Sequence, residues 1–314
     1  MSKEKFPSYF TTVVALTEGD CFIAGHLTKQ ASEPNFTRLD MVRGGQWLQL
    51  GALKDVLYGA TAAPTADHAR LSVVALGREG AMRVFRPGQQ PAELAVPRKD
   101  KTGYLEGLCV ASDGALIVCG SQNEVLRYAG EQWQAIDEGL FEKFNGKNDS
   151  ALFAIAETRP GTLLAVGSRG LAVSREGGGA WHTLDAPTNL DLHAVLPAGD
   201  GGAWVAGDGG TLLRLSPDGT QWQDHSDPDL STAPFDSLAL YKGTLYISAM
   251  NQLLSLDTAD PQASLQPVAG PFKAGSEFHS VSACGEYLWA TGDEHVYRLG
   301  PDAQWQYLLC PDNA

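Results

Sequence analysis

The sequence is poor in basic residues and contains no long apolar segment. Its 314 residues include 23 Lys and Arg against 37 Asp and Glu, a formal net charge of −14. A nucleic-acid ligand needs a basic stripe that neutralises phosphates, so direct binding of nucleic acid is disfavoured. No apolar run approaches the roughly 18 residues of a membrane-spanning helix, so we expect no membrane insertion.

Cysteine is also scarce. The five cysteines are odd in number and scattered, with no C-x-x-C pair. The apolar piece Val13–Leu16 near the N-terminus is too short for the hydrophobic region of a secretory signal. Reduced thiols without an export signal predict a cytoplasmic protein. The sequence has no Walker A, G-x-S-x-G, H-E-x-x-H or EF-hand motif, so we expect no cofactor, no metal and no enzymatic activity.

What the chain does contain is a tryptophan that returns at a regular interval, each time after a short turn. The gaps between successive members are 86, 48, 41 and 83 residues, one or two multiples of a period in the forties. Such a period is typical of β-propellers, in which each repeat forms one blade. The tryptophans in this series are Trp47, Trp133, Trp181, Trp222 and Trp305.

A second landmark marks the start of each repeat. It is a five-residue pattern with Leu or Phe in second place and a small residue in fourth, as in Asp191–Val195. Its variable centre returns at intervals of 47, 48, 47, 40, 43 and 43 residues. The centres are Thr11, Tyr58, Glu106, Phe153, His193, Asp236 and His279. Seven repeats predict an all-β fold, a seven-bladed β-propeller of four-stranded antiparallel blades in one domain, with approximate blades 9–50, 55–97, 103–137, 150–186, 190–226, 233–268 and 276–310.

Each repeat also predicts the role of its strands. The second strand usually ends in glycine, which suits an inner strand packed closely against its neighbours. The third carries an arginine in five blades, expected to be a solvated or packed stem. The fourth carries the tryptophan, expected to seal one blade against the next. Longer loops are expected at Thr28–Asn35 and Pro64–His68.

Two turns carry a resemblance to known propellers. The segment Ser174–Trp181 (Ser-Arg-Glu-Gly-Gly-Gly-Ala-Trp) resembles the Asp-box, Ser-x-Asp-x-Gly-x-Thr-Trp, of BNR and sialidase-type propellers, and Ser216–Trp222 is a version one residue shorter. The chain is similar to the YVTN/BNR-like group, which includes photosystem II assembly factors. The resemblance implies the propeller fold and not an activity, because these turns are structural devices. It also departs from both families: no pattern of several arginines matches the sialidase carboxylate clamp, and the assembly factors are secreted or lumenal and present a basic patch.

The acidic charge is uneven along the chain. Residues 151–314 hold 7 Lys and Arg against 19 Asp and Glu, whereas the first 150 residues are nearly balanced. Such a charge keeps a protein dispersed, and it also steers association with a basic partner.

The best candidate site is the mouth of the central channel, where the first strands begin and the turns between second and third strands emerge. An acidic connection between the fifth and sixth blades is expected to join it. A histidine pair with a carboxylate there would also suit a divalent metal or acid–base work, although the spacing of the two histidines follows from the repeat. The candidate binding residues are Tyr58, Glu106, His193, Asp208, Asp224, Asp227, Asp229, Asp236, His279, Asp293 and Glu294.

Three functions follow as hypotheses. The favoured one is a non-enzymatic binding propeller whose acidic face caps a basic protein, for example an immunity protein that neutralises an interbacterial toxin. The second is a lyase or glycan hydrolase that uses His193, Asp236 and His279 at the channel mouth. The third is an assembly factor like the photosystem II group.

Overall fold

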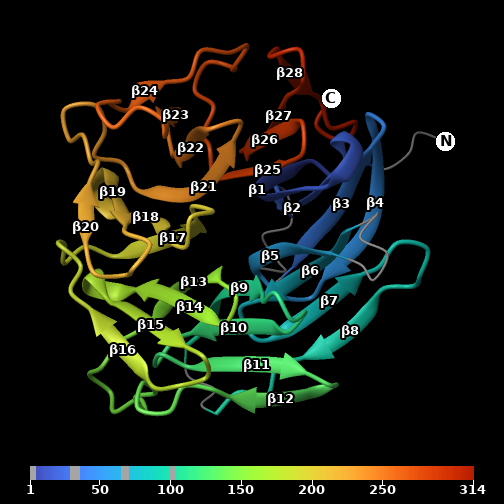
Figure 1. Ribbon diagram of the computed structural model, residues 1–314. Coiled ribbons are helices and arrows are strands. Elements are labelled where there is room, and N and C mark those ends of the chain that lie inside the picture. Colours follow the sequence, from blue (N-terminus) through green and yellow to red (C-terminus); the bar gives the residue numbers. More distant parts are fainter. Residues whose placement is uncertain (1–4, 29–35, 65–70, 100–102) are drawn as a thin grey trace. The chain divides into compact units, whose positions relative to one another are not determined.

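The computed structural model describes residues 5–28, 36–64, 71–99 and 103–314. Within them, seven consecutive four-stranded antiparallel sheets follow one another along the chain, each built from strands in sequence order (Figure 1). The predicted fold class, an all-β propeller of seven four-stranded blades, is confirmed. Both predicted longer loops, at Thr28–Asn35 and Pro64–His68, lie almost wholly outside the described residues.

The first three blades comprise β1 (Ser8–Ala15), β2 (Cys21–Leu27), β3 (Thr37–Arg43) and β4 (Gln46–Leu53); β5 (Leu57–Pro64), β6 (Leu71–Gly77), β7 (Ala81–Phe85) and β8 (Ala92–Ala95); and β9 (Leu105–Val110), β10 (Leu116–Gly120), β11 (Val125–Ala129) and β12 (Gln132–Ala135). The fourth and fifth comprise β13 (Leu152–Arg159), β14 (Thr162–Gly167), β15 (Ala172–Glu176) and β16 (Trp181–Leu184); and β17 (Leu192–Pro197), β18 (Ala203–Gly207), β19 (Thr211–Leu215) and β20 (Trp222–Asp224). The last two comprise β21 (Phe235–Tyr241), β22 (Thr244–Ala249), β23 (Gln252–Asp257) and β24 (Gln266–Pro267); and β25 (Ser280–Cys284), β26 (Tyr287–Gly292), β27 (His295–Leu299) and β28 (Trp305–Leu308).

Helical structure in the described part of the chain is confined to three 3₁₀ turns, η1 (Thr17–Gly19), η2 (Ser168–Gly170) and η3 (Asp208–Gly210). Among these residues no helix has the length and apolar character needed to cross a bilayer.

The chain forms two compact units. The terminal unit comprises Met1–Gly77, Arg83–Glu93 and Ala239–Ala314, and the middle unit comprises Arg78–Met82 and Leu94–Leu238. The single domain expected from the sequence stays a prediction.

In the terminal unit the first blade packs directly on the seventh. Strand β1 contacts β25 and β26, and Phe10 forms a bridge with Asp293. Each of these two blades has its own four strands, so no strand is exchanged between the chain ends. Buried Phe10, Ile23 and Trp289 belong to one shared apolar cluster. Burial of such side chains stabilises the joint by roughly 1.5–3 kcal/mol each.

The C-terminal tail is tied to the same joint. The Arg38 guanidinium donates to the carboxylates of Asp40 (2.6 Å) and Asp312 (2.6 Å). Asn313 accepts from the Ser8 backbone N–H at 2.8 Å and donates to the Ser8 carbonyl at 2.9 Å. Arg38 is buried, so of the solvated or packed stems expected on third strands it is a packed one.

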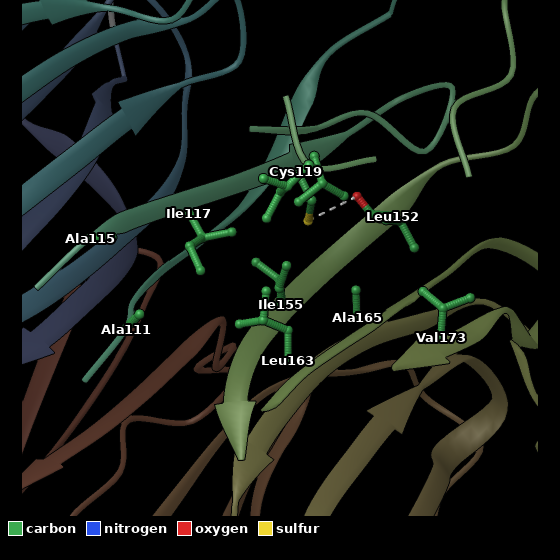
Figure 2. Close-up of a cluster of buried hydrophobic side chains, with 11 residues drawn as sticks. Ala111, Ala115, Ile117, Cys119, Leu152, Ile155, Leu163, Ala165 and Val173 are labelled. Carbon is green, nitrogen blue, oxygen red and sulfur yellow. Dashed lines mark hydrogen bonds between the residues drawn. The ribbon is translucent and has the colours of Figure 1, made fainter. Parts of the chain in front are cut away.

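In the middle unit the first strands β9, β13 and β17 are neighbours. Figure 2 shows the core between the third and fourth blades, where Ile117 and Cys119 face Leu152, Ile155 and Val173. The Cys119 thiol donates to the Leu152 carbonyl at 3.6 Å. Strands β10 and β18 are buried along their whole length, as expected for inner strands.

The tryptophans seal blades as predicted in four cases. The Trp181 indole N–H donates to the Ile136 carbonyl of the preceding blade at 2.6 Å. Trp47, Trp222 and Trp305 pack against clusters that contain residues of a neighbouring blade. The Trp133 ring lies 5.0 Å from the ring of Tyr128 in its own blade.

The variable centre of the five-residue pattern is the site of a β-bulge. In the fifth blade Leu192 pairs with Gly207 and Ala194 with Ala206, so His193 is the extra residue. The same register shift occurs at Thr11, Tyr58, Glu106 and Phe153. A bulge bends its strand and re-aims the side chain, so each of these five blades presents its bulge residue at an equivalent position of the blade.

Candidate functional site

Within a blade, three segments share one end. In the fifth blade Leu192 at the start of β17 pairs with Gly207 at the end of β18, and Leu213 near the start of β19 pairs with Asp224 at the end of β20. The first strand therefore begins where the turn between the second and third strands lies and where the fourth strand leaves. We call this the leading end of a blade. The segments that meet at the leading end of this blade are those that the sequence predicted to lie together.

The leading ends of the middle unit align three bulge residues on adjacent strands. Glu106, Phe153 and His193 lie on β9, β13 and β17. The Phe153 and His193 rings stack with centroids 5.4 Å apart. His193 Nε2 lies 2.8 Å from Oδ1 of Asp208, in the turn of its own blade. Both partners are partly exposed, so the pair is accessible to a ligand.

Glu106 lies in a different electrostatic environment. Burial raises the pKa of its carboxyl to about 7, although the charges of Arg78 and Arg98 act to lower it. The Arg78 guanidinium lies 4.6 Å from the centre of the Tyr104 ring, and the Tyr104 side chain is exposed. A carboxyl that titrates near neutrality suits proton exchange or a pH-dependent contact.

The acidic connection between the fifth and sixth blades lies at the same end. A Cβ on Gly210 would lie 2.2 Å from the Ser231 carbonyl oxygen, which places the connection beside the Asp208–Gly210 turn. Asp224 and Asp227 accept backbone N–H groups of this connection, and Asp229 is exposed. Asp236 follows on β21, half-buried.

In the terminal unit the leading ends bring His279 and Asp293 together with two residues that sequence reasoning did not select. Tyr9 comes from the first blade and Glu277 from the seventh. The Tyr9 hydroxyl donates to Oε2 of Glu277 at 3.0 Å and lies 2.8 Å from Nε2 of His279. That nitrogen lies 3.4 Å from Glu277 Oε2 and 4.0 Å from Asp293 Oδ1. We call Tyr9, Glu277, His279 and Asp293 the blade-joint cluster.

Burial raises the pKa of the Tyr9 phenol, and hydrogen bonds to Asp293 and Glu277 raise it further, so Tyr9 keeps its proton. The phenol is thus a fixed donor toward the carboxylates. One imidazole nitrogen and two carboxylate oxygens within 4.8 Å of one another match a set of metal ligands.

Two other candidates, Tyr58 and Glu294, lie in the same unit. Tyr58 is the bulge residue of the second blade, with 46% of its surface exposed. Glu294 is exposed next to Asp293, and its carbonyl accepts from the Asn313 side chain at 3.4 Å.

His193 belongs to the middle unit and His279 to the terminal unit, and each has carboxylate partners of its own unit. The histidine pair considered from the sequence stays a prediction. The convergence of all candidates on one channel mouth stays a prediction. A signal for Tyr9 and Glu277 did exist, because both occupy the first place of the five-residue pattern, two residues before the centre.

Solved structures confirm the fold. The chain is similar to virginiamycin B lyase from Staphylococcus aureus, with a TM-score of 0.72 and 12% identity over 93% of this chain and 94% of the other. It is also similar to YCF48 bound to D1 peptide, with a TM-score of 0.57 and 12% identity over 75% and 77% of the two chains. At such identities the likeness extends to the fold alone.

Comparison of amino-acid sequences gives information on the family as well as on the fold. No described family profile matches the chain. The immune protein Tsi7 of Pseudomonas aeruginosa, however, is 30% identical over 279 residues, which cover 83% of this chain and 84% of Tsi7. A relationship of this extent bears out the hypothesis of an immunity protein. The chain belongs to the family of the immune protein Tsi7.

Proposed function

We propose that this protein neutralises a basic toxin in the cytoplasm by binding it, without turnover of a substrate. The observation that carries the proposal is the 30% identity with the immune protein Tsi7 along most of both chains. Immunity by binding requires a surface that complements the toxin, and the leading ends of the blades supply exposed side chains on a rigid scaffold.

Uncompensated acidic charge supports a basic partner. In the first half of the chain many carboxylates have a cation, as in Asp20 with Arg43 and Asp113 with Arg127. No Lys or Arg nitrogen of the described residues lies within 4.0 Å of the carboxylates of Asp224, Asp227 or Asp229. Unpaired charges of one sign set up a field that accelerates the approach of a basic partner.

The five free thiols support a reducing compartment. Cell fractionation with a tagged chain tests this part of the proposal: recovery with the cytoplasmic fraction is expected, and recovery in the periplasm contradicts it.

The decisive experiment measures how much protein is needed to inhibit the toxin. The toxin is first identified by pull-down with the tagged chain, and its activity is then assayed against increasing amounts of the purified chain. A binding inhibitor removes activity in proportion to its amount, with a break at a fixed stoichiometry. An enzyme that destroys the toxin or its product protects at amounts far below the toxin, and that outcome would overturn the proposal.

Single alanine variants separate the two mechanisms further. If the protein is a binder, His193→Ala, Asp236→Ala and His279→Ala each shift the dissociation constant at most and leave the stoichiometry unchanged. Loss of all protection with unchanged binding of the toxin would instead indicate catalysis by these side chains.

A further inference from the structure

We propose that the blade-joint cluster is a site for a divalent first-row cation such as Zn²⁺ or Mn²⁺, which joins the first blade to the seventh. Glu277, His279 and Asp293 supply three ligands, and Tyr9 adds a hydroxyl from the other blade. The inference is independent of toxin binding.

The donor set fits such a cation in type and in placement. Nε2 of His279 and single oxygens of Glu277 and Asp293 all lie within 4.8 Å of one another, so small side-chain rotations bring them to a common centre. One imidazole with two carboxylates suits zinc or manganese, whereas sites for harder cations consist of oxygen alone. Three protein ligands leave positions for water, and 41% of the Glu277 side chain is exposed toward solvent.

The two negative charges of the cluster favour the binding of a cation. Two carboxylates share the site, and among the described residues no Lys or Arg nitrogen lies within 4.0 Å of either. The buried carboxylate of Glu124, at the leading end of the third blade, does have such a partner, because Arg98 Nε lies 3.5 Å from it. Like charges at this distance repel one another unless a proton or a metal ion is bound between them.

An equivalent place in the fifth blade shows what the site requires. Asp191, His193 and Asp208 correspond in order to Glu277, His279 and Asp293. There the Asp191 carboxylate accepts the backbone N–H of Arg169 at 2.7 Å instead of joining the histidine. The ring against His193 belongs to Phe153, which has no oxygen to offer. The fifth blade therefore provides a matched control with one histidine–carboxylate pair.

The cluster lies where the first blade contacts the seventh, so a cation bound there would strengthen that contact. The Phe10 N–H donates to the Asp293 carbonyl at 2.6 Å, and the preceding residue, Tyr9, reaches the cluster with its side chain. Asp293 itself has a φ of 52°, a left-handed conformation that the surrounding contacts maintain. A cation would be held by residues of the seventh blade, and one of these ligands, Glu277, accepts the Tyr9 hydroxyl of the first blade. Because that arrangement exists only in the folded state, binding of the cation stabilises the joint.

The test uses the full chain after treatment with a chelator. Zn²⁺, Mn²⁺ and Mg²⁺ are each titrated by calorimetry, and the melting temperature is measured at saturation. We expect one site for Zn²⁺ or Mn²⁺ and a rise in melting temperature of at least about 2 °C. Glu277→Gln and His279→Ala should each weaken binding by at least about tenfold, as loss of a ligand or its support does, and His193→Ala should leave it unchanged.

Two results overturn the proposal. One is the absence of both heat and thermal shift in the wild type with Zn²⁺ and with Mn²⁺. The other is a pattern of variants that does not fit the cluster. Binding of the cation would then be weakened as much by His193→Ala as by His279→Ala, or it would be unchanged in Glu277→Gln. Should His279→Ala fail to fold, Glu277→Gln decides alone, because that side chain is partly exposed and its amide still accepts from Tyr9.

Discussion

A Cβ atom on Gly167 would lie 1.9 Å from the carbonyl oxygen of Ala151. Gly167 ends β14 beside the bulge at Phe153, and its backbone is extended, with a φ of −171°. Glycine is needed here because the start of the first strand approaches the backbone, not because of a left-handed conformation. A Cβ on the glycine near or at the end of four other second strands would meet a backbone carbonyl in the same way, at Gly25, Gly120, Gly207 and Gly292.

Gly167→Ala should therefore lower the free energy of unfolding by about 3 kcal/mol, since a buried backbone has to move. Urea denaturation measures the loss. Gly179→Ala is the control, because its Cβ would meet only the Glu176 carbonyl, at 3.1 Å, and it should cost about 1 kcal/mol or less. Equal effects of the two substitutions would contradict the assigned role of the close approach.

Arg38→Ala should destabilise the protein far more than Arg43→Ala on the same strand. Arg38 and Asp40 are both buried, so removal of the guanidinium leaves a buried carboxylate without its partner, at a cost of about 3–5 kcal/mol. The Arg43 side chain is 59% exposed in its pair with Asp20, and its loss should cost less than about 1 kcal/mol. Chemical denaturation of both variants at neutral pH checks the difference. A small effect of Arg38→Ala would show that Asp40 is neutral or solvated.

Glu106→Gln should make the protein more stable at alkaline pH. The pKa of this carboxyl is raised to about 7 in the folded protein from an ordinary value of 4.5, chiefly by burial. The folded state thus binds the proton more tightly, and the stability of the wild type falls as the pH rises from about 4.5 to 7. Glutamine has no charge to desolvate, so the variant should gain about 2 kcal/mol relative to the wild type between pH 5 and pH 8.

Unfolding curves at the two pH values measure that gain. Exposed Glu131 provides the control substitution to glutamine, which should show no such pH dependence. A pH-independent difference between Glu106→Gln and the wild type would show that the carboxyl ionises normally.

Asp227→Asn together with Asp229→Asn should slow association with the toxin. If the unpaired charges of this connection steer a basic partner, the association rate at low salt should fall about threefold, and its dependence on salt should become weaker. Stopped-flow mixing at several salt concentrations provides the measurement. Asp218→Asn serves as the control, because Asp218 lies in the β19–β20 turn at the opposite end of the same blade. An equal effect of Asp218→Asn would assign the attraction to overall charge.

Much of the fold was accessible from the sequence because the repeat signals are local. The turn before Trp181 recurs in five blades and the pattern around His193 in all seven. Strand pairing within a blade joins residues that are close in the chain. The bulge residues were found as the variable centres of that pattern. Only the strand register shows that these residues form bulges. It also shows that the second strand needs a glycine there, because a backbone carbonyl lies too close for a Cβ atom.

The candidate site was accessible only in part. His279 and Asp293 were selected because the repeat places them at a leading end, whereas Tyr9 and Glu277 were not, because their place in the pattern is occupied by unrelated residues elsewhere. Arg38 was expected to be either a solvated or a packed stem, and only the tertiary structure shows that it is buried and paired with Asp312 of the C-terminal tail.

The sequence by itself determined the number of blades, the order of their strands and the acidic character of the second half of the chain, since these depend on local periodicity and composition. Tertiary structure decided which side chains meet. Tyr9 and Glu277 are 268 residues apart in the chain, and they form a hydrogen bond because the first blade packs against the seventh. Contacts of that kind depend on the burial of apolar surface between distant segments, which leaves no periodic mark in the sequence.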